Sequence, residues 1–221
     1  MDYDWNFDVV FDAFPFLLEG VQYTLLVTCL SMFFGFILGL FLSLVRLSRV
    51  KWISQAALIY VEFFRGTPVL MQLLWVYYSL PILTGVTFPS FTTAIIALSM
   101  NLGAFIAEIF RAGIQSVGRD QREAAFALGM EYNQIMRRII LPQAFRRIIP
   151  PLGSTWVSLF KDTSLVSVIV VPEIMYRASI LSIETYRPVE IYTVVAFLYF
   201  ILTYPQARMV DFMYGRMRVR N

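Results

Sequence analysis

The feature that most constrains this chain is a pair of long stretches without a single charged side chain. Residues 20–45 carry no charge, and neither do residues 66–107, which contain a turn-like segment from Pro81 to Pro89. A helix needs about 20 mostly apolar residues to cross the hydrocarbon core of a bilayer. The first stretch is long enough for one crossing, and the second for two half-spans or more. The sequence therefore predicts an all-α integral membrane protein.

Composition supports the same interpretation. Hydrophobic residues make up 58% of the 221-residue chain and charged residues only 15%. A soluble domain carries about 25% charged residues, so a soluble fold of this length would expose much apolar surface to water. A bilayer solvates that surface instead. The length suits about five crossings in one membrane domain over residues 1–221, with no second globular domain.

Hydropathy predicts five transmembrane helices. They are Phe16–Val45, Ile53–Leu80, Phe91–Gln115, Ala144–Phe160 and Pro188–Met209. The fourth is short and stops before Lys161-Asp162, after which an apolar run resumes at Leu165–Val171. That interruption favours a broken helix, or a helix followed by a re-entrant segment. The first span is expected to stay in the membrane, because the residues before it are acidic and a cleavable signal peptide begins with a basic segment.

The distribution of basic residues predicts the orientation. All but three of the 18 lysines and arginines fall in three regions: the segment from Arg46 to Arg65, the long loop after the third span, and the C-terminal end. The three exceptions are Lys161, Arg177 and Arg187. Basic loops stay in the cytoplasm. The N-terminus is therefore expected outside and the C-terminus inside, which agrees with an odd number of spans.

Residue types argue against catalysis by this chain. There is no histidine, and Cys29 is the only cysteine, so the commonest metal ligand and general base are absent and no metal site is expected. A phosphate-binding loop needs Gly-Lys followed by Ser or Thr. The only lysines, Lys51 and Lys161, follow Val50 and Phe160. The chain is not expected to be an enzyme or to bind a cofactor itself.

The long loop of about residues 116–142 carries the most informative pattern. Residues Arg122 to Leu128 are good helix formers, and Gly129 stands where a helix end favours a left-handed residue. Ala124 and Ala125 would give this short helix a small-residue face open to close approach. Pro142 is expected to begin the next membrane helix. A short helix exposed to the cytoplasm in this way would suit docking into a groove on a partner protein. The alternative is an amphipathic helix that lies on the membrane surface.

The same loop carries a family resemblance. It reads Glu-Ala-Ala, three residues, Gly, nine residues, and then Ile-x-Leu-Pro, from Glu123 to Pro142. This pattern resembles the signature loop of permease subunits of bacterial ABC importers. The resemblance implies that the segment is a cytoplasmic coupling helix that docks on an ATP-hydrolysing subunit. It implies that Glu123, Ala124, Ala125 and Gly129 transmit nucleotide-driven motion to the membrane helices.

Further stretches extend the resemblance over nearly the whole chain and point to the polar amino acid uptake branch. They are Tyr23-Thr24-Leu25 with Gly35 and Gly39, Phe63-Phe64-Arg65-Gly66-Thr67-Pro68, Ala107-Glu108-Ile109-Phe110-Arg111-Ala112-Gly113-Ile114, and Lys161-Asp162-Thr163-Ser164-Leu165. Taken alone, the Gly35-x-x-x-Gly39 pair favours close helix packing inside the subunit.

The resemblance implies a type I ABC importer permease in the bacterial inner membrane. The implied partners are two ATPase subunits carrying ATP and magnesium, an identical or similar second permease, an extracytoplasmic solute-binding protein and membrane lipid. The implied cargo is an amino acid, moved by alternating access; nucleic acid is not an expected partner. The alternatives from other classes are an ion-coupled secondary transporter and a membrane scaffold subunit.

Ionisable groups at membrane depth are the candidates for substrate binding. Asn101 and Glu108 are seven residues apart and share one face of the third span, while residues 161–164 lie at the break of the fourth. An amino acid needs hydrogen-bond donors for its carboxylate and acceptors for its ammonium group. The expected substrate residues are Asn101, Glu108, Lys161, Asp162, Thr163 and Ser164. The alternatives are structural ion pairs, Lys161 with Asp162 and Glu108 with Arg111.

Overall fold

The computed structural model describes residues 4–48 and 50–217, and every regular element in that part of the chain is a helix. Three helices are long and apolar enough to cross a membrane: α2 (Phe14–Arg46), α6 (Ser90–Gln115) and α11 (Pro188–Met217). Two bent helix pairs pass the same test, which gives up to five spans. The predicted all-α membrane fold is confirmed.

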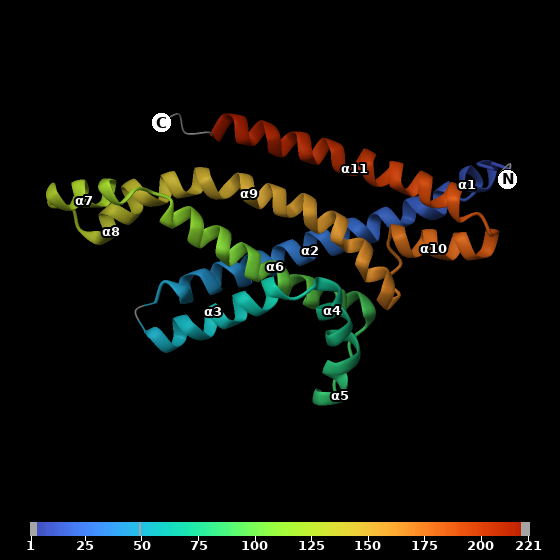
Figure 1. Cartoon of the computed structure of the whole chain (residues 1–221), viewed down its shortest axis with the longest axis horizontal. Helices are drawn as coiled ribbons and strands as arrows, with labels where there is room; N and C mark the ends of the chain where they lie inside the picture. The colour runs from blue at the N-terminus through green and yellow to red at the C-terminus, as the bar shows by residue number, and fades with distance from the viewer. Residues whose placement is uncertain (1–3, 49, 218–221) are drawn as a thin grey trace.

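Helices α2 and α6 pack side by side and form the centre of the molecule, with α9 (Leu141–Asp162) beside them (Figure 1). Close approach depends on small residues, as the glycine pair in α2 predicts. A Cβ on Gly35 would lie 2.8 Å from the Leu102 side chain. From the other side, a Cβ on Gly103 would lie 2.8 Å from Leu38. The Gly35-x-x-x-Gly39 pair therefore serves packing within the subunit.

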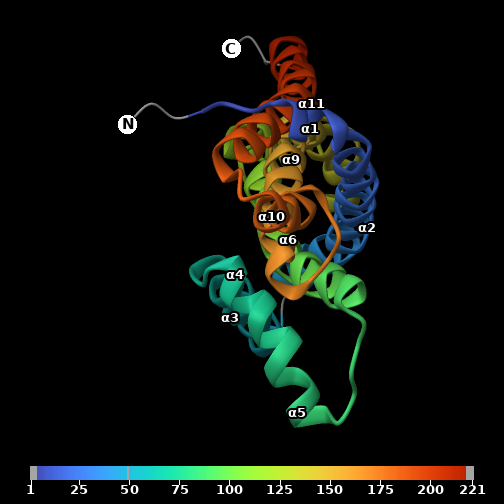
Figure 2. The same cartoon turned by 90° about the vertical axis from the view of Figure 1, so that its right-hand side faces the viewer.

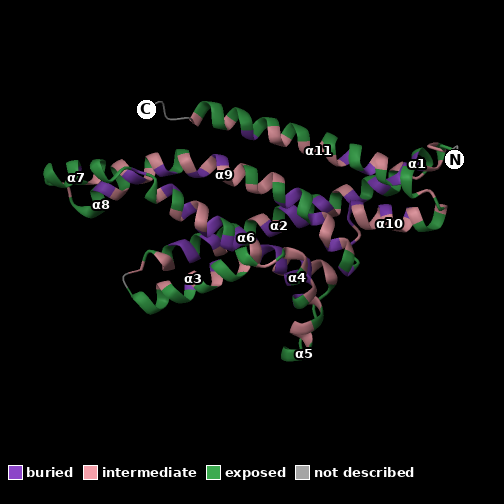
Figure 3. Ribbon diagram, in the orientation of Figure 1, coloured by how far each residue is buried: buried purple, intermediate pink, exposed green. Residues whose placement is uncertain are grey.

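The outer surface of the molecule carries many large apolar side chains. In α2 the buried positions are mostly small or hydroxyl-bearing, whereas large side chains such as Phe33, Phe41 and Leu44 are exposed. Figure 3 shows the same pattern, with buried residues gathered where α2, α6 and α9 meet. Lipid solvates large apolar side chains as well as a protein interior does, and small residues let helices approach each other. This distribution is the one expected of a chain that lies in a bilayer.

The second predicted span, Ile53–Leu80, is wrong as a single helix. The structure has two helical rods here. The first is α3 (Lys51–Gly66), and the second consists of α4 (Val69–Leu74), the π-helical turn η1 (Trp75–Ser79) and α5 (Leu80–Thr84). The second rod is bent from the first by 107°. The cause is Pro68, which disfavours a helical conformation in the residue before it. Thr67 is accordingly extended, with φ −112° and ψ 144°.

These two rods form an arm that stands away from the rest of the molecule (Figure 2). Both rods of the arm contact α6, and α3 also contacts α2. The arm exposes large apolar side chains, among them Trp75 and Tyr78.

The predicted interruption of the fourth span is present, but the bend lies later in the chain than residues 161–164. Helix α9 ends at Asp162, a 3₁₀ segment η3 runs over Thr163–Ile169, and α10 occupies Ile174–Thr185. The bend of 49° separates the helical run that ends at Ile169 from α10, so it falls at residues 170–173. Glu173 is fully buried and caps α10, because its carboxylate accepts hydrogen bonds from the backbone N–H groups of Met175 (2.8 Å) and Tyr176 (2.7 Å). Tyr199 of α11 donates a third hydrogen bond to the same carboxylate at 3.0 Å.

The long loop folds into α7 (Arg119–Ala127) and α8 (Tyr132–Ile135). After α8 a π-helical turn, η2 (Met136–Ile140), leads without a break into α9. Pro142 lies at the start of α9, as predicted. Proline has no N–H to donate, so the wider π turn before it accommodates a position that cannot make a regular helical bond.

The carboxyl end of α2, the α7–α8 segment and the end of α11 all lie at one end of the molecule, and α1 (Asp8–Asp12) lies at the other (Figure 1). This grouping of the basic regions is the one that the orientation argument needs; which end faces the cytoplasm stays a prediction. Arg65 is an exception. It lies in the last turn of α3, about 20 Å along the helix axis from Lys51. Arg49, Arg218 and Arg220 lie outside the described residues.

Candidate functional site

A cavity of about 230 Å³ lies between α6 and α9 and contains two of the predicted substrate residues. Asn101 contributes from α6 and Asp162 from the last position of α9. The α9 wall also carries the hydroxyl groups of Ser154, Thr155 and Ser158. Ser154, Ser158 and Asp162 recur every fourth residue, so they lie on one face of the helix. The remaining lining is apolar, as in most small-molecule sites.

Asn101 is held in place by hydrogen bonds to the two sides of the break between α3 and α4. Its side-chain amide donates to the carbonyl oxygen of Phe64 at 3.0 Å and to Oε1 of Gln72 at 3.1 Å. Gln72 in turn donates to Phe64 and to Thr67, whose backbone leaves the helix there. Both N–H bonds of Asn101 are therefore used, which leaves Oδ1 as the acceptor group of its side chain.

The other predicted residues at the end of α9 do not line this cavity. Lys161 and Ser164 line a separate pocket against α11, with Tyr192 and Tyr199. Thr163 is fully buried, and its hydroxyl donates to the carbonyl oxygen of Phe160 at 2.7 Å. The Ser164 hydroxyl donates to the carbonyl oxygen of Lys161 at 2.8 Å. Consecutive residues of a helix point in different directions, which separates Asp162 from its neighbours.

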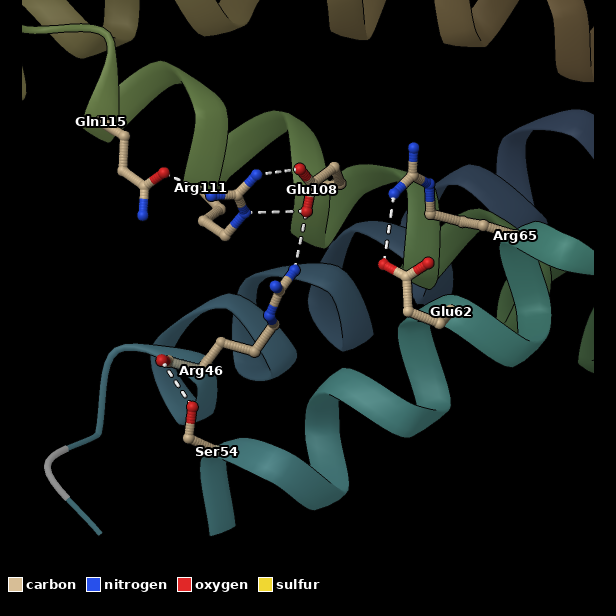
Figure 4. A network of polar contacts seen from close by, with 7 residues as sticks. All are labelled: Arg46, Ser54, Glu62, Arg65, Glu108, Arg111 and Gln115. Carbon is tan, nitrogen blue, oxygen red and sulfur yellow. Dashed lines mark hydrogen bonds and ion pairs between the residues drawn. The ribbon is translucent and has the colours of Figure 1, made fainter. Parts of the chain in front are cut away.

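Glu108 lies away from the cavity that Asn101 lines, in an ion network toward the carboxyl end of α6 (Figure 4). Its Oε2 accepts a hydrogen bond from Arg46 of α2 at 2.7 Å, and both of its oxygens accept from Arg111, one turn further along α6. The structural pair with Arg111 is thus present, and Arg46 joins it. A carboxylate held by two guanidinium groups is committed to that network rather than to a ligand's ammonium group.

The α7–α8 segment has an exposed apolar surface. Phe126 is 54% exposed, Leu128 82% and Tyr132 59%. Glu123 and Ala124 are also exposed, and Glu123 pairs with Arg119 at 3.2 Å. Gly129 has φ +76°, the left-handed conformation predicted for it.

The prediction that Ala124 and Ala125 together form an exposed small-residue face is correct for Ala124 only. Ala125 is 2% exposed and packs into the core with Ile135 and Ala144. The helix has 3.6 residues per turn, so Ala124 and Ala125 point about 100° apart and only one of them can face a partner.

Sequence reasoning missed the serines of the cavity and the partners of Asn101. The spacing of Ser154, Ser158 and Asp162 was the available signal, because four-residue spacing places side chains on one helix face. The bonds of Asn101 to Phe64 and Gln72 had no such signal, because they join segments separated by 37 and 29 residues.

Residues 13–219 match the family of binding-protein-dependent transport system inner membrane components. The chain belongs to this family. Among curated relatives, the L-cystine transport system permease protein TcyB of Bacillus subtilis is 42% identical over 89% of this chain and 85% of its own length. The probable amino-acid ABC transporter permease protein YckA of the same organism is 39% identical over 90% and 87%. The glutamine transport system permease protein GlnP of Escherichia coli is 37% identical over 92% of each chain.

Solved structures agree with this assignment. The crystal structure of an amino acid ABC transporter with histidines matches with a TM-score of 0.92 and 36% identity, covering 97% of this chain and all of the other. An inward-facing structure of the MetNI methionine ABC transporter has the same fold, with a TM-score of 0.77 at 22% identity. The chain is a permease subunit of the ABC transporter class, with the type I importer fold, and it is a multi-pass protein of the bacterial inner membrane.

Proposed function

We propose that this chain is the translocation subunit of an ATP-driven importer for polar amino acids or close relatives. A solute-binding protein outside the membrane would deliver the cargo. Two ATPase subunits, each carrying ATP and magnesium, would bind at the α7–α8 end. The curated relatives named for cystine and glutamine transport support this class of cargo. Since this chain lacks a phosphate-binding loop, hydrolysis is assigned to the partner ATPase and the chain itself is not an enzyme.

The observation that carries the proposal is the exposed α7–α8 segment. Phe126, Leu128 and Tyr132 present apolar surface at one end of the molecule, next to exposed charges on Glu123 and Arg119. A short helix whose inner side is packed and whose outer side is apolar is suited to a groove on another protein. We assign this surface to the ATPase, with Glu123, Ala124 and Gly129 in or beside the contact and Ala125 supporting it from behind.

The cavity between α6 and α9 is the proposed substrate site. The ammonium group of an amino acid would bind the Asp162 carboxylate and the free Oδ1 of Asn101. Its carboxylate would accept hydrogen bonds from the hydroxyl of Ser158. We assign a structural role at the end of α9 to the three neighbouring residues Lys161, Thr163 and Ser164. Lys161 and Ser164 line another pocket, and the hydroxyl groups of Thr163 and Ser164 donate to neighbouring carbonyl oxygens.

Alternating access is the proposed mechanism. Binding of ATP would bring the two ATPases together and move the docked α7 helices. A second permease, identical to this chain or similar, would complete the pathway. Rearrangement of the membrane helices would then open the cavity first to the outside and then to the inside.

The test is uptake by proteoliposomes that contain this chain with its co-purified partners. We expect labelled amino acid to accumulate only with ATP, magnesium and the binding protein present. Uptake driven by a proton or sodium gradient without ATP would overturn the proposal in favour of a secondary transporter. Isolation of the intact, folded chain from its native membrane with no ATPase bound would favour a scaffold.

A further inference from the structure

The carboxyl end of α6 is held by side chains from two other helices. The last carbonyl groups of a helix have no partners within it and need donors from elsewhere. Ser116 supplies two, because its N–H donates to Ala112 at 2.9 Å and its hydroxyl donates to Gly113 at 2.7 Å. Arg122 donates to the carbonyl oxygen of Ile114 at 3.2 Å, and Arg147 donates to that of Ser116.

The two arginines come from the helices that lie on either side of α8 in the chain. Arg122 belongs to α7, and Arg147 belongs to the first turns of α9. A guanidinium group at a helix carboxyl end binds the carbonyls and complements the negative end of the helix dipole. Hydrogen bonds from a charged donor are roughly twice as strong as neutral ones. The end of α6 is therefore tied to α7 on one side and to α9 on the other.

Apolar packing closes the space behind these bonds. Val117 and Ala125 are each 2% exposed, and Ile135 is 1% exposed. On α6, Gly113 allows Ile148 of α9 so close that a Cβ at that position would overlap its side chain. Interiors packed this tightly transmit displacement rather than absorb it.

The ion network extends the same unit to α2. Glu108 lies on α6 about two turns before the clamped end, and Arg46 reaches it from the last residue of α2 (Figure 4). Among the described helices, α2 and α6 also pack against each other most extensively. The proposed substrate cavity lies further along the same α6 and α9.

We propose that Arg122 and Arg147 are positioning residues that make the docking helix α7, the end of α6 and the first half of α9 move as one body. A displacement of α7 would then reach Asn101 through α6 and Asp162 through α9. This inference rests on the proposed function, because it concerns how the docking segment delivers the work of the ATPase. The short connection at residues 116–118 would otherwise act as a hinge.

The experiment compares Arg147→Gln with Arg146→Gln in proteoliposomes of the assembled complex. Both changes remove one positive charge from adjacent residues, but Arg146 is exposed and takes no part in the α6 clamp. The readout is amino acid transported per ATP hydrolysed. Loss of one charge-assisted hydrogen bond shifts the equilibrium between the clamped and unclamped end of α6 roughly tenfold toward the unclamped state. We therefore expect the ratio to fall by up to roughly tenfold in Arg147→Gln and to stay at the wild-type value in Arg146→Gln. Arg147→Lys, which keeps a charged donor, should recover most of it.

A second variant, Arg122→Gln, is measured in the same way, so the test does not depend on a single variant assembling with the ATPase. A wild-type ratio in whichever of the two glutamine variants assembles with the ATPase would overturn the clamp. So would an equal loss in Arg146→Gln, which would indicate a general charge effect. Absence of ATP-dependent uptake by the wild-type complex would instead count against the proposed function.

Discussion

Ile106 of α6 occupies the space that Gly39 of α2 leaves by having no side chain. A Cβ built on Gly39 would lie 2.6 Å from the Cβ of Ile106 and 2.9 Å from the carbonyl oxygen of Gly103. A side chain added at Gly39 would therefore overlap both Ile106 and the backbone of α6. The Gly39 position sets the spacing of the two central helices.

The first prediction concerns that contact. Gly39→Ala should destabilise the protein by about 1–3 kcal/mol, because overpacking forces two rigid helices apart. The measurement is the apparent melting temperature of the purified subunit in detergent. The control is Gly215→Ala in α11, where nothing lies within 4 Å of an added Cβ and a helix gains from alanine. Equal melting temperatures for the two variants would contradict the packing argument.

The second prediction separates Asp162 from Lys161. Asp162→Asn should raise the substrate concentration for half-maximal uptake roughly tenfold or more, because a charged partner of the ammonium group is lost. Lys161→Gln should leave it nearly unchanged, since Lys161 lines a different pocket. Both are measured as initial uptake rates in proteoliposomes with saturating binding protein. A larger effect at Lys161 would move the site to the α11 side.

The third prediction concerns Gly129, whose φ of +76° is unfavourable for most residues with a Cβ. Gly129→Ala should cost about 1 kcal/mol locally and misplace the end of α7. We expect weaker binding of the ATPase and fewer molecules transported per ATP. Gly118→Ala is the matched change, because Gly118 precedes the same helix with φ −51° and has open space around it. If both variants behave as wild type, Gly129 has no part in coupling.

The fourth prediction assigns Glu108 to structure rather than to substrate. Glu108→Gln leaves Arg46 and Arg111 facing each other and should lower stability by about 1–2 kcal/mol, with substrate affinity unchanged. Glu62→Gln should have little effect, because Glu62 is 63% exposed in its pair with Arg65. Melting temperature and uptake are measured on the same preparations. A loss of affinity without a loss of stability in Glu108→Gln would return this residue to the substrate site.

Much of the fold follows from local pattern. The charge-free runs predict α2 and α6 because the bilayer demands apolar length, and the polar pair Lys161-Asp162 marks the end of α9 correctly. The bend at Thr67-Pro68 was missed because hydropathy continues through it. The signal for the bend is Pro68 itself, because a proline disfavours a helical conformation in the residue before it, whatever the hydropathy around it.

The site was less predictable than the fold. The sequence predicts Asn101 and Asp162 for the same site, and they do line one cavity. Glu108 shares a helix face with Asn101, but seven residues of helix separate them by about 10 Å along the axis. Its partner Arg46 is 62 residues away in the chain. Pairing at that distance depends on how α2 packs on α6, which no local pattern specifies.

The π turn at Met136–Ile140 holds one residue more than a regular helix needs between α8 and α9. Each residue of an α-helix turns the chain by about 100°. The extra residue therefore sets the angular phase between the docking segment and the membrane helix that carries Asp162. Shortening this turn by one residue would preserve every side chain of the docking surface yet rotate it away from the direction in which a partner must approach.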